Sequence, residues 1–265
     1  GTGDGNVVGV DVRTGQPLWR FQLSQGGVNA SVVVQDNILV AIHGKENIDS
    51  SGEGRMVGIK LPTQLPAPGE PQLILKDKDL KIADGKAWEL WRLQHAMFTS
   101  SPAMADGRVY QVSKTGVLVC VDIKTGKELF AKKINNDQIH SSPLYADGHL
   151  YLGFPNGRFM VVKPGDDDAE IVSEVKLEGG ILGSPVAWNG KIYIHTKTKL
   201  YCFGKASGQK PTATLPAAPT QISVGNAVAL QIIPGDVLLK PGQTIKLTVN
   251  TIDANGNVVE RNVHA

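Results

Sequence analysis

Residues 120–134 read CVDIKTGKELFAKKI, and residues 9–23 read GVDVRTGQPLWRFQL. Both stretches have a small residue, Val and Asp, then Thr-Gly after two more residues, and finally a large aromatic residue. In Asp-x-x-Thr-Gly the Asp side chain can accept backbone N–H groups of a turn, and the Gly supplies a positive φ. The pattern therefore predicts the same tight turn between two strands at two places in the chain.

A second motif repeats at a shorter interval. It reads SSPAMADGRVYQV at 100–112, SSPLYADGHLYLG at 141–153 and GSPVAWNGKIYIH at 183–195, at offsets of 41 and 42 residues. A weaker copy, ASVVVQDNILVAI, begins at Ala30, and the Pro-rich insertion at 61–85 explains its longer interval. Asp-Gly or Asn-Gly between two short β-prone runs is a strong hairpin signal. The chain is therefore a row of β units, each about 41 residues long.

Four antiparallel strands in each unit predict an all-β fold, a β-propeller of four-stranded blades. We assign about four and a half blades to residues 1–205, as units 1–23, 28–93, 97–134, 139–177 and 181–204. The first unit is the second half of a blade, and the last lacks an obvious fourth strand. Because an unpaired strand edge can template aggregation, we expect upstream blades in a longer chain to cover these edges.

The composition changes after the last unit. Residues 206–220 are rich in Pro, Ala and Thr and are predicted to be a linker. Residues 221–265 alternate apolar and polar residues around the turn sequences KPGQT and ANGN, which predicts the first strands of a second all-β domain.

The units resemble the PQQ-like propeller repeat of quinoprotein alcohol dehydrogenases and of the BamB-type outer-membrane assembly lipoprotein. The resemblance rests on SSPAMADGRVYQV, GVLVCVDIKTGKELF and GVDVRTGQPLW. The tail, with LKPGQTIKLTV and DANGNVV, resembles a bacterial immunoglobulin-like module, so 221–265 is expected to be a truncated domain of that kind, a partial β-sandwich. Together the two resemblances imply an exported bacterial protein that is periplasmic, secreted or at the cell surface.

Composition narrows the classes of partner. Apolar residues make up 41% of the chain and charged residues 20%, and the formal net charge is +2. This is an ordinary globular composition without a basic cluster, so nucleic acid is not expected as a partner. No apolar run approaches the length of a transmembrane segment.

The resemblance to quinoprotein dehydrogenases implies adjacent cysteines beside the quinone, a stacked Trp and a bound Ca²⁺. This sequence has no Cys-Cys pair. Cys120 and Cys202 occupy the same place in blades two apart, too far for a disulfide, and both are predicted to be buried free thiols. We predict no catalytic residue, no metal ligand and no cofactor. PQQ and Ca²⁺ enter only if upstream blades carry the quinone site.

Four residues are candidate ligand contacts at the mouth of the propeller channel. His43, His140 and His195 fall at strand ends in three blades, where they could bind a metal or an anionic ligand. No His-x-His spacing supports a metal, so isolated histidines that cap strand ends are favoured. Trp188 precedes an Asn-Gly turn and is expected to be more exposed than the other tryptophans.

These features favour a non-catalytic propeller that acts as an extracytoplasmic binding or scaffold module for a protein partner. We expect the insertion at 61–85 to make the contact, since rigid blades present variable loops on their faces. One alternative is a fragment of a quinoprotein-type oxidoreductase. Another is a cell-surface protein that binds a glycan through Trp188 and the immunoglobulin-like module.

Overall fold

The computed structural model describes the chain except residues 76–87, 137, 205–223, 236 and 262–265. The chain divides into two compact units, Gly1–Asp11 with Gln16–Lys210, and Val12–Gly15 with Pro211–Ala265. No described residue lies in a helix, which confirms the all-β prediction. Accordingly, no helix long and apolar enough to cross a membrane occurs in the described part of the chain.

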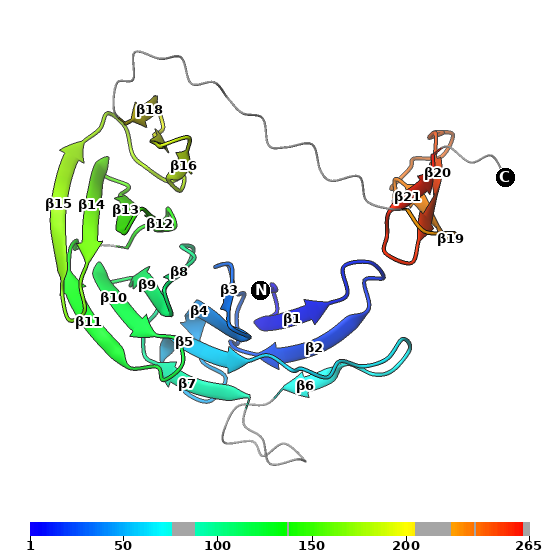
Figure 1. The fold of residues 1–265 in the computed structure, drawn as a ribbon, viewed down its shortest axis with the longest axis horizontal. Coiled ribbons are helices and arrows are strands. Elements are labelled where there is room, and N and C mark those ends of the chain that lie inside the picture. Colours follow the sequence, from blue (N-terminus) through cyan, green and yellow to red (C-terminus); the bar gives the residue numbers. More distant parts are fainter. Residues whose placement is uncertain (76–87, 137, 205–223, 236, 262–265) are drawn as a thin grey trace. The chain divides into compact units, whose positions relative to one another are not determined.

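Three sheets of the first unit have four antiparallel strands each, which confirms the predicted blade. Figure 1 shows them side by side, with β8 and β12 on the inner side and β11 and β15 on the outer side. Their strands are β3 (Val33–Gln35), β4 (Ile38–Glu46), β5 (Glu53–Lys60) and β7 (Glu89–Leu93); β8 (Ala103–Ala105), β9 (Arg108–Val112), β10 (Val117–Asp122) and β11 (Glu128–Lys133); and β12 (Leu144–Ala146), β13 (His149–Gly153), β14 (Arg158–Pro164) and β15 (Ala169–Lys176).

The first and last sheets of this unit have three described strands each. They are β1 (Asn6–Val10), β2 (Pro17–Gln22) and β6 (Leu73–Leu75), and β16 (Val186–Trp188), β17 (Lys191–His195) and β18 (Leu200–Phe203). The strand β6 comes from the Pro-rich insertion and pairs in parallel with β2. No hydrogen-bonded strand pair joins the first of these sheets to the last among the described residues.

The apolar core lies between neighbouring sheets. Val7 and Phe21 of the first sheet pack against Val57 and Ile59 of the second, and further clusters follow between each later pair of sheets. Each blade therefore buries both faces only when it has a neighbour on each side.

Adjacent blades are also joined at their inner strands by a ladder of serine hydroxyl groups. The backbone N–H of Ser31 donates to Oγ of Ser101 (2.8 Å), and the N–H of Ser101 donates to Oγ of Ser142 (3.0 Å). The N–H of Ser142 donates in turn to Oγ of Ser184 (2.9 Å). The serine that repeats in the sequence thus makes the contact from each blade to the next.

At the outer strands, a tryptophan of one blade packs on the Thr-Gly turn of the next. The indole N–H of Trp91 in β7 donates to the carbonyl oxygen of Ile123 (2.7 Å). Gly126 of that turn has a φ of 72°, and an added Cβ there would collide with the Trp91 ring. Asp122 holds the turn by accepting from the backbone N–H (2.8 Å) and the hydroxyl (2.7 Å) of Thr125. At this interface the Thr-Gly turn therefore receives the aromatic residue of the preceding blade.

Within a blade, the outer aromatic residue lies opposite a small residue of the neighbouring strand. A β-bulge follows each of these pairs, and an added Cβ on either glycine would collide with the Trp opposite. The pairs are Gly9 with Trp19, Gly58 with Trp91, and Cys120 with Phe130.

The second unit contains one described sheet, with strand order β19 (Ala227–Ile233), β20 (Thr248–Asp253) and β21 (Val258–Glu260). Asp253 accepts from the backbone N–H groups of Gly225, Asn255 and Asn257, and these bonds lower its pKa to about 2. The immunoglobulin-like sandwich remains a prediction. The linker at 206–220 lies outside the described residues.

The Trp91 contact predicts that two similar glycines differ in their tolerance of a side chain. Gly15 and Gly126 lie in the same turn sequence, with φ values of 73° and 72°, but an added Cβ at Gly15 meets nothing within 4 Å. Gly15→Ala should cost about 1 kcal/mol of unfolding free energy, from left-handed strain alone. Gly126→Ala should cost a further ~1–3 kcal/mol, because the ring of Trp91 must move. Urea denaturation of both variants measures the difference, and equal losses would show that Trp91 does not rest on this turn.

Candidate functional site

One face of the last blade, β16–β17–β18, is open. Val186 pairs with Tyr193, Tyr193 with Cys202, and His195 with Leu200, and directly paired residues point to the same side of a sheet. The opposite side carries Ile192, Ile194, Tyr201 and Phe203, which pack with Phe159 and Ile181 on and beside the preceding blade. We call the first side the open face; it consists of Val186, Trp188, Lys191, Tyr193, His195, Leu200 and Cys202.

The open face exposes residues whose counterparts are buried inside the propeller. Leu200 is 68% exposed, whereas Leu118, at the same place in the β8–β11 blade, is 0% exposed. Trp188 is 56% exposed and lies near Val186, which is 55% exposed. The open face therefore corresponds to the side on which an inner blade packs against its successor. No further described sheet of the first unit packs on it.

The two cysteines differ in burial, although both are free. Cys120 lies between two blades, and its burial raises the pKa of its thiol to about 11. Cys202 is exposed, so the prediction that both thiols are buried was wrong for this residue. The reason is that Cys202 belongs to the open face, on which no other described sheet of the first unit packs.

The four candidate residues do not form one site. His195 and Trp188 share the open face. His140 is exposed at an inner strand, where its Nδ1 lies 3.0 Å from the Thr99 hydroxyl of the preceding blade. His43 is 1% exposed. In the described ranges, no three His, Cys, Asp or Glu side chains come close enough to hold a metal ion.

His43 is an unusual buried group. It lies in β4 opposite Arg55 of β5, and neither of its ring nitrogens has a hydrogen-bond partner within the described part of the chain. Burial, and secondarily the Arg55 charge, lowers the pKa of His43 from 6.5 to about 4. The backbone of Lys45 and the Asn47 side chain act weakly in the opposite direction. His43 is therefore neutral near pH 7 and is not a surface ligand contact.

The acidic side chains of the loop after β4 already have cationic partners. Asp49 forms ion pairs with Arg55 and with Arg92 (2.7 Å), and Glu53 pairs with Lys114 of the next blade. The pKa of Asp49 is lowered, mainly by the hydrogen bond from Arg55. These contacts join the loop to the blades, which is a structural role.

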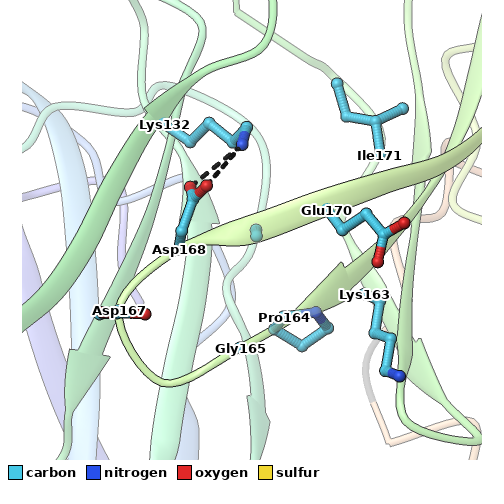
Figure 2. A pocket seen from close by; sticks show the side chains of 9 residues that line it. Lys132, Lys163, Pro164, Gly165, Asp167, Asp168, Glu170 and Ile171 are labelled. Atoms are coloured by element: carbon cyan, nitrogen blue, oxygen red, sulfur yellow. Dashed lines mark hydrogen bonds and ion pairs between the residues drawn. The ribbon is translucent and has the colours of Figure 1, made fainter.

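An outer-rim cleft of about 560 Å³ lies where β15 begins (Figure 2). Asp168 binds the Lys132 ammonium group with both carboxylate oxygens (3.1 and 2.9 Å). Arg108 pairs with Asp166 (2.6 Å) and donates to the carbonyl oxygen of Gly165 (2.8 Å). These ion pairs and hydrogen bonds therefore bind the acidic turn 165–168 to the preceding blade. Spacing within the turn gave no sign of these partners, which come from another blade.

The described residues do not fit the quinone site of a quinoprotein dehydrogenase. Cys120 is enclosed between two blades and Cys202 lies on the open face, so they cannot act as a pair beside one ring. The ring of Trp91 packs against Gly126 of the neighbouring blade, and its N–H donates to the carbonyl oxygen of Ile123. This side chain is therefore not placed to stack on a quinone.

The difference between the cysteines can be measured by thiol labelling. In the native protein at pH 8, Cys202 should react fast and Cys120 slowly, because Cys120 is buried and its thiol stays protonated. Cys202→Ser should remove the fast reaction, whereas Cys120→Ser should keep it. Denaturation should reveal two thiols in the unsubstituted chain. Two equally fast native thiols would contradict the packing at Cys120, and none after denaturation would contradict both assignments.

The burial of His43 predicts that the folded protein loses stability in acid. Its folded-state pKa of about 4 lies below its ordinary value of 6.5, so the unfolded chain binds the proton more tightly. Stability should therefore fall as the pH drops from about 6.5 to 4. The loss is about 3 kcal/mol, since a tenfold change in proton affinity is worth about 1.4 kcal/mol. His43→Gln should flatten this part of the pH profile of urea unfolding. An unchanged slope would show that His43 is not buried as a neutral ring.

The comparisons with known proteins agree with this architecture. The family described as outer membrane protein assembly factor BamB matches residues 78–166. BamB from Moraxella catarrhalis has 15% identity and a TM-score of 0.52, over 75% of this chain and 51% of that one. The chain therefore spans about half the length of that structure.

Two further structures have a similar fold. Sqt1 from Saccharomyces cerevisiae has 14% identity and a TM-score of 0.54, over 98% of this chain and 67% of that chain. The computationally designed Ika8 protein has 17% identity and a TM-score of 0.53, over 77% of this chain and 54% of that chain. No curated protein sequence matches this chain. The repeats, the four-stranded blades and the structural similarity show that the repeat region is an unclosed β-propeller, and the family match shows that residues 78–166 are similar to the PQQ-like repeats of the BamB type.

Proposed function

We propose that this propeller is a non-catalytic scaffold outside the cytoplasm, and that the open face is the surface on which it binds a protein partner. The observation that carries the proposal is the exposure of Trp188 and Leu200, by 56% and 68%, on one continuous sheet face. Contiguous exposed apolar surface marks interaction sites, and Trp often dominates the binding energy of an interface.

The rest of the propeller suits a scaffold because its blades are locked to one another. The serine ladder fixes the inner strands, and the contact of Trp91 with the Gly126 turn fixes the outer ones. A surface held this way loses little conformational entropy when a partner binds.

The neighbouring side chains favour a protein over a glycan. A sugar could stack on Trp188 and bond to Lys191, Tyr193 or His195, but the exposed aliphatic residues Val186 and Leu200 on the same face suit the apolar surface of a protein better. The name of the matching family, an outer membrane protein assembly factor, supports both a protein partner and a place in the bacterial envelope. The proposed scaffold uses no cofactor.

The partner contact expected at the insertion 61–85 remains a separate prediction. Residues 73–75 of the insertion lie against β2, with Leu75 only 3% exposed. Residues 76–85 lie outside the described part of the chain.

Site-specific photo-crosslinking tests the open face. A photoreactive amino acid replaces Val186, and in a control protein it replaces Val34, which is 53% exposed on the inner strand β3. In cells that produce the full-length protein, light should join the Val186 position to a second polypeptide in one defined band, and the Val34 position should give none.

The adduct identifies what covers the face. A band that contains a different protein supports the proposal. A link within the same chain, which leaves the mass unchanged, would show that the protein covers this face by itself. No adduct, or the same adduct from both positions, would also contradict the proposal.

A further inference from the structure

The outer strand of the β12–β15 blade has a free edge that differs from those of the other four-stranded blades. β15 has eight residues, Ala169–Lys176, and all but Ala169 are exposed. Among the described strands, β15 pairs with β14 alone. In the neighbouring blade Phe130 of β11 is 6% exposed, but Ser173 stands at the same place in β15, opposite Val161. β15 therefore lacks the aromatic residue that anchors β11.

The aliphatic residues of β15 face solvent. Ile171 is 41% exposed, and Val172, which is 42% exposed, is the extra residue of a β-bulge opposite Val161 and Val162. Exposed strand edges are usually protected by charged residues. Glu174 does not serve this purpose, because Arg158 of β14 holds it with two hydrogen bonds (2.7 and 2.9 Å). The edge thus combines free backbone groups with exposed aliphatic side chains.

The chain itself shows what such an outer edge accepts. β2 is the outer strand of the first blade, and β6 adds to it in parallel, with Trp19 opposite Leu73 and Phe21 opposite Leu75. The added segment is Leu-Ile-Leu, an extended aliphatic run. Backbone pairing supplies affinity in this mode of recognition, and alternate side chains supply specificity.

The cleft beside β15 adds a preference for charge. Figure 2 shows the Lys132–Asp168 pair at one end and Glu170 and Lys163 away from it. Lys132 neutralises Asp168. The other charged groups that line the cleft are the ammonium group of Lys163 and the carboxylates of Asp167 and Glu170. The remaining charge is negative, so the cleft favours a basic side chain beside the aliphatic residue that contacts Ile171.

We propose that the edge of β15, with this cleft, is a second binding site that takes an extended aliphatic peptide with a basic residue from a partner protein. The peptide adds a fifth strand to the blade, as β6 adds a strand to β2. This site is on the outer rim and does not depend on the open face, so either proposal can fail without the other.

The probe is a fluorescent peptide with the sequence Pro-Gln-Leu-Ile-Leu-Lys, which is that of residues 71–76. Fluorescence anisotropy should show saturable binding to the full chain. Ile171→Asp should raise Kd at least about tenfold, because the aliphatic contact with the peptide is lost. Leu90→Asp is the matched control, because Leu90 is a 39% exposed aliphatic residue on the outer strand β7. It should leave Kd unchanged. A peptide with Glu in place of Lys should bind more weakly.

Hydrogen exchange of the unsubstituted protein gives a readout that needs no variant. The peptide should slow exchange in residues 169–176 and leave β7 and β11 unchanged. No binding, protection of β7 or β11 instead of β15, equal loss of affinity in both variants, or equal affinity for the Lys and Glu peptides would overturn the proposal.

Discussion

The structure depends on the contact in which an aromatic side chain of one blade rests on the Thr-Gly turn of the next. Gly126 is required there twice, because its φ of 72° disfavours a side chain and because Trp91 fills the space that a Cβ would take. The indole N–H of Trp91 also satisfies the carbonyl group of Ile123. This contact joins the β3–β7 and β8–β11 blades at their outer strands, and the serine ladder joins each blade to the next at the inner strands. A blade is therefore complete only when another blade or a partner covers it.

The two proposed binding surfaces both arise where this pattern of contacts ends. The open face has Leu200 and Cys202 where inner blades have buried residues, because no further described sheet of the first unit packs on this side of β16–β18. The edge of β15 has Ser173 where β11 has Phe130, so an exposed aliphatic strand replaces an anchored one. Both proposed binding surfaces thus lie where the chain deviates from its repeat. The regular blades provide rigidity.

The sequence predicted what is local or repeated, namely the hairpins, the turn at Asp122 and the four-stranded blade. It did not predict features that depend on distant residues. Burial of Cys202 was inferred from its equivalence to Cys120, but burial is decided by the next sheet. β6 was missed because its three residues have no periodicity and its partner β2 lies some 50 residues earlier. Likewise, nothing around His43 indicated that Arg55 would lie opposite it in a buried strand pair.

The central claim is that each blade is held by its successor and that the last described blade is left open for a partner. The most direct measurement is residue-level amide hydrogen exchange of the isolated full-length chain by NMR. The amides of Ser101 and Ser142 donate to the next blade, whereas the Ser184 amide has no such serine partner in the described structure. We expect slow exchange at Ser101 and Ser142 and fast exchange at Ser184. Protection of Ser184 equal to that of Ser142 would show that the face is already covered, and would contradict this account.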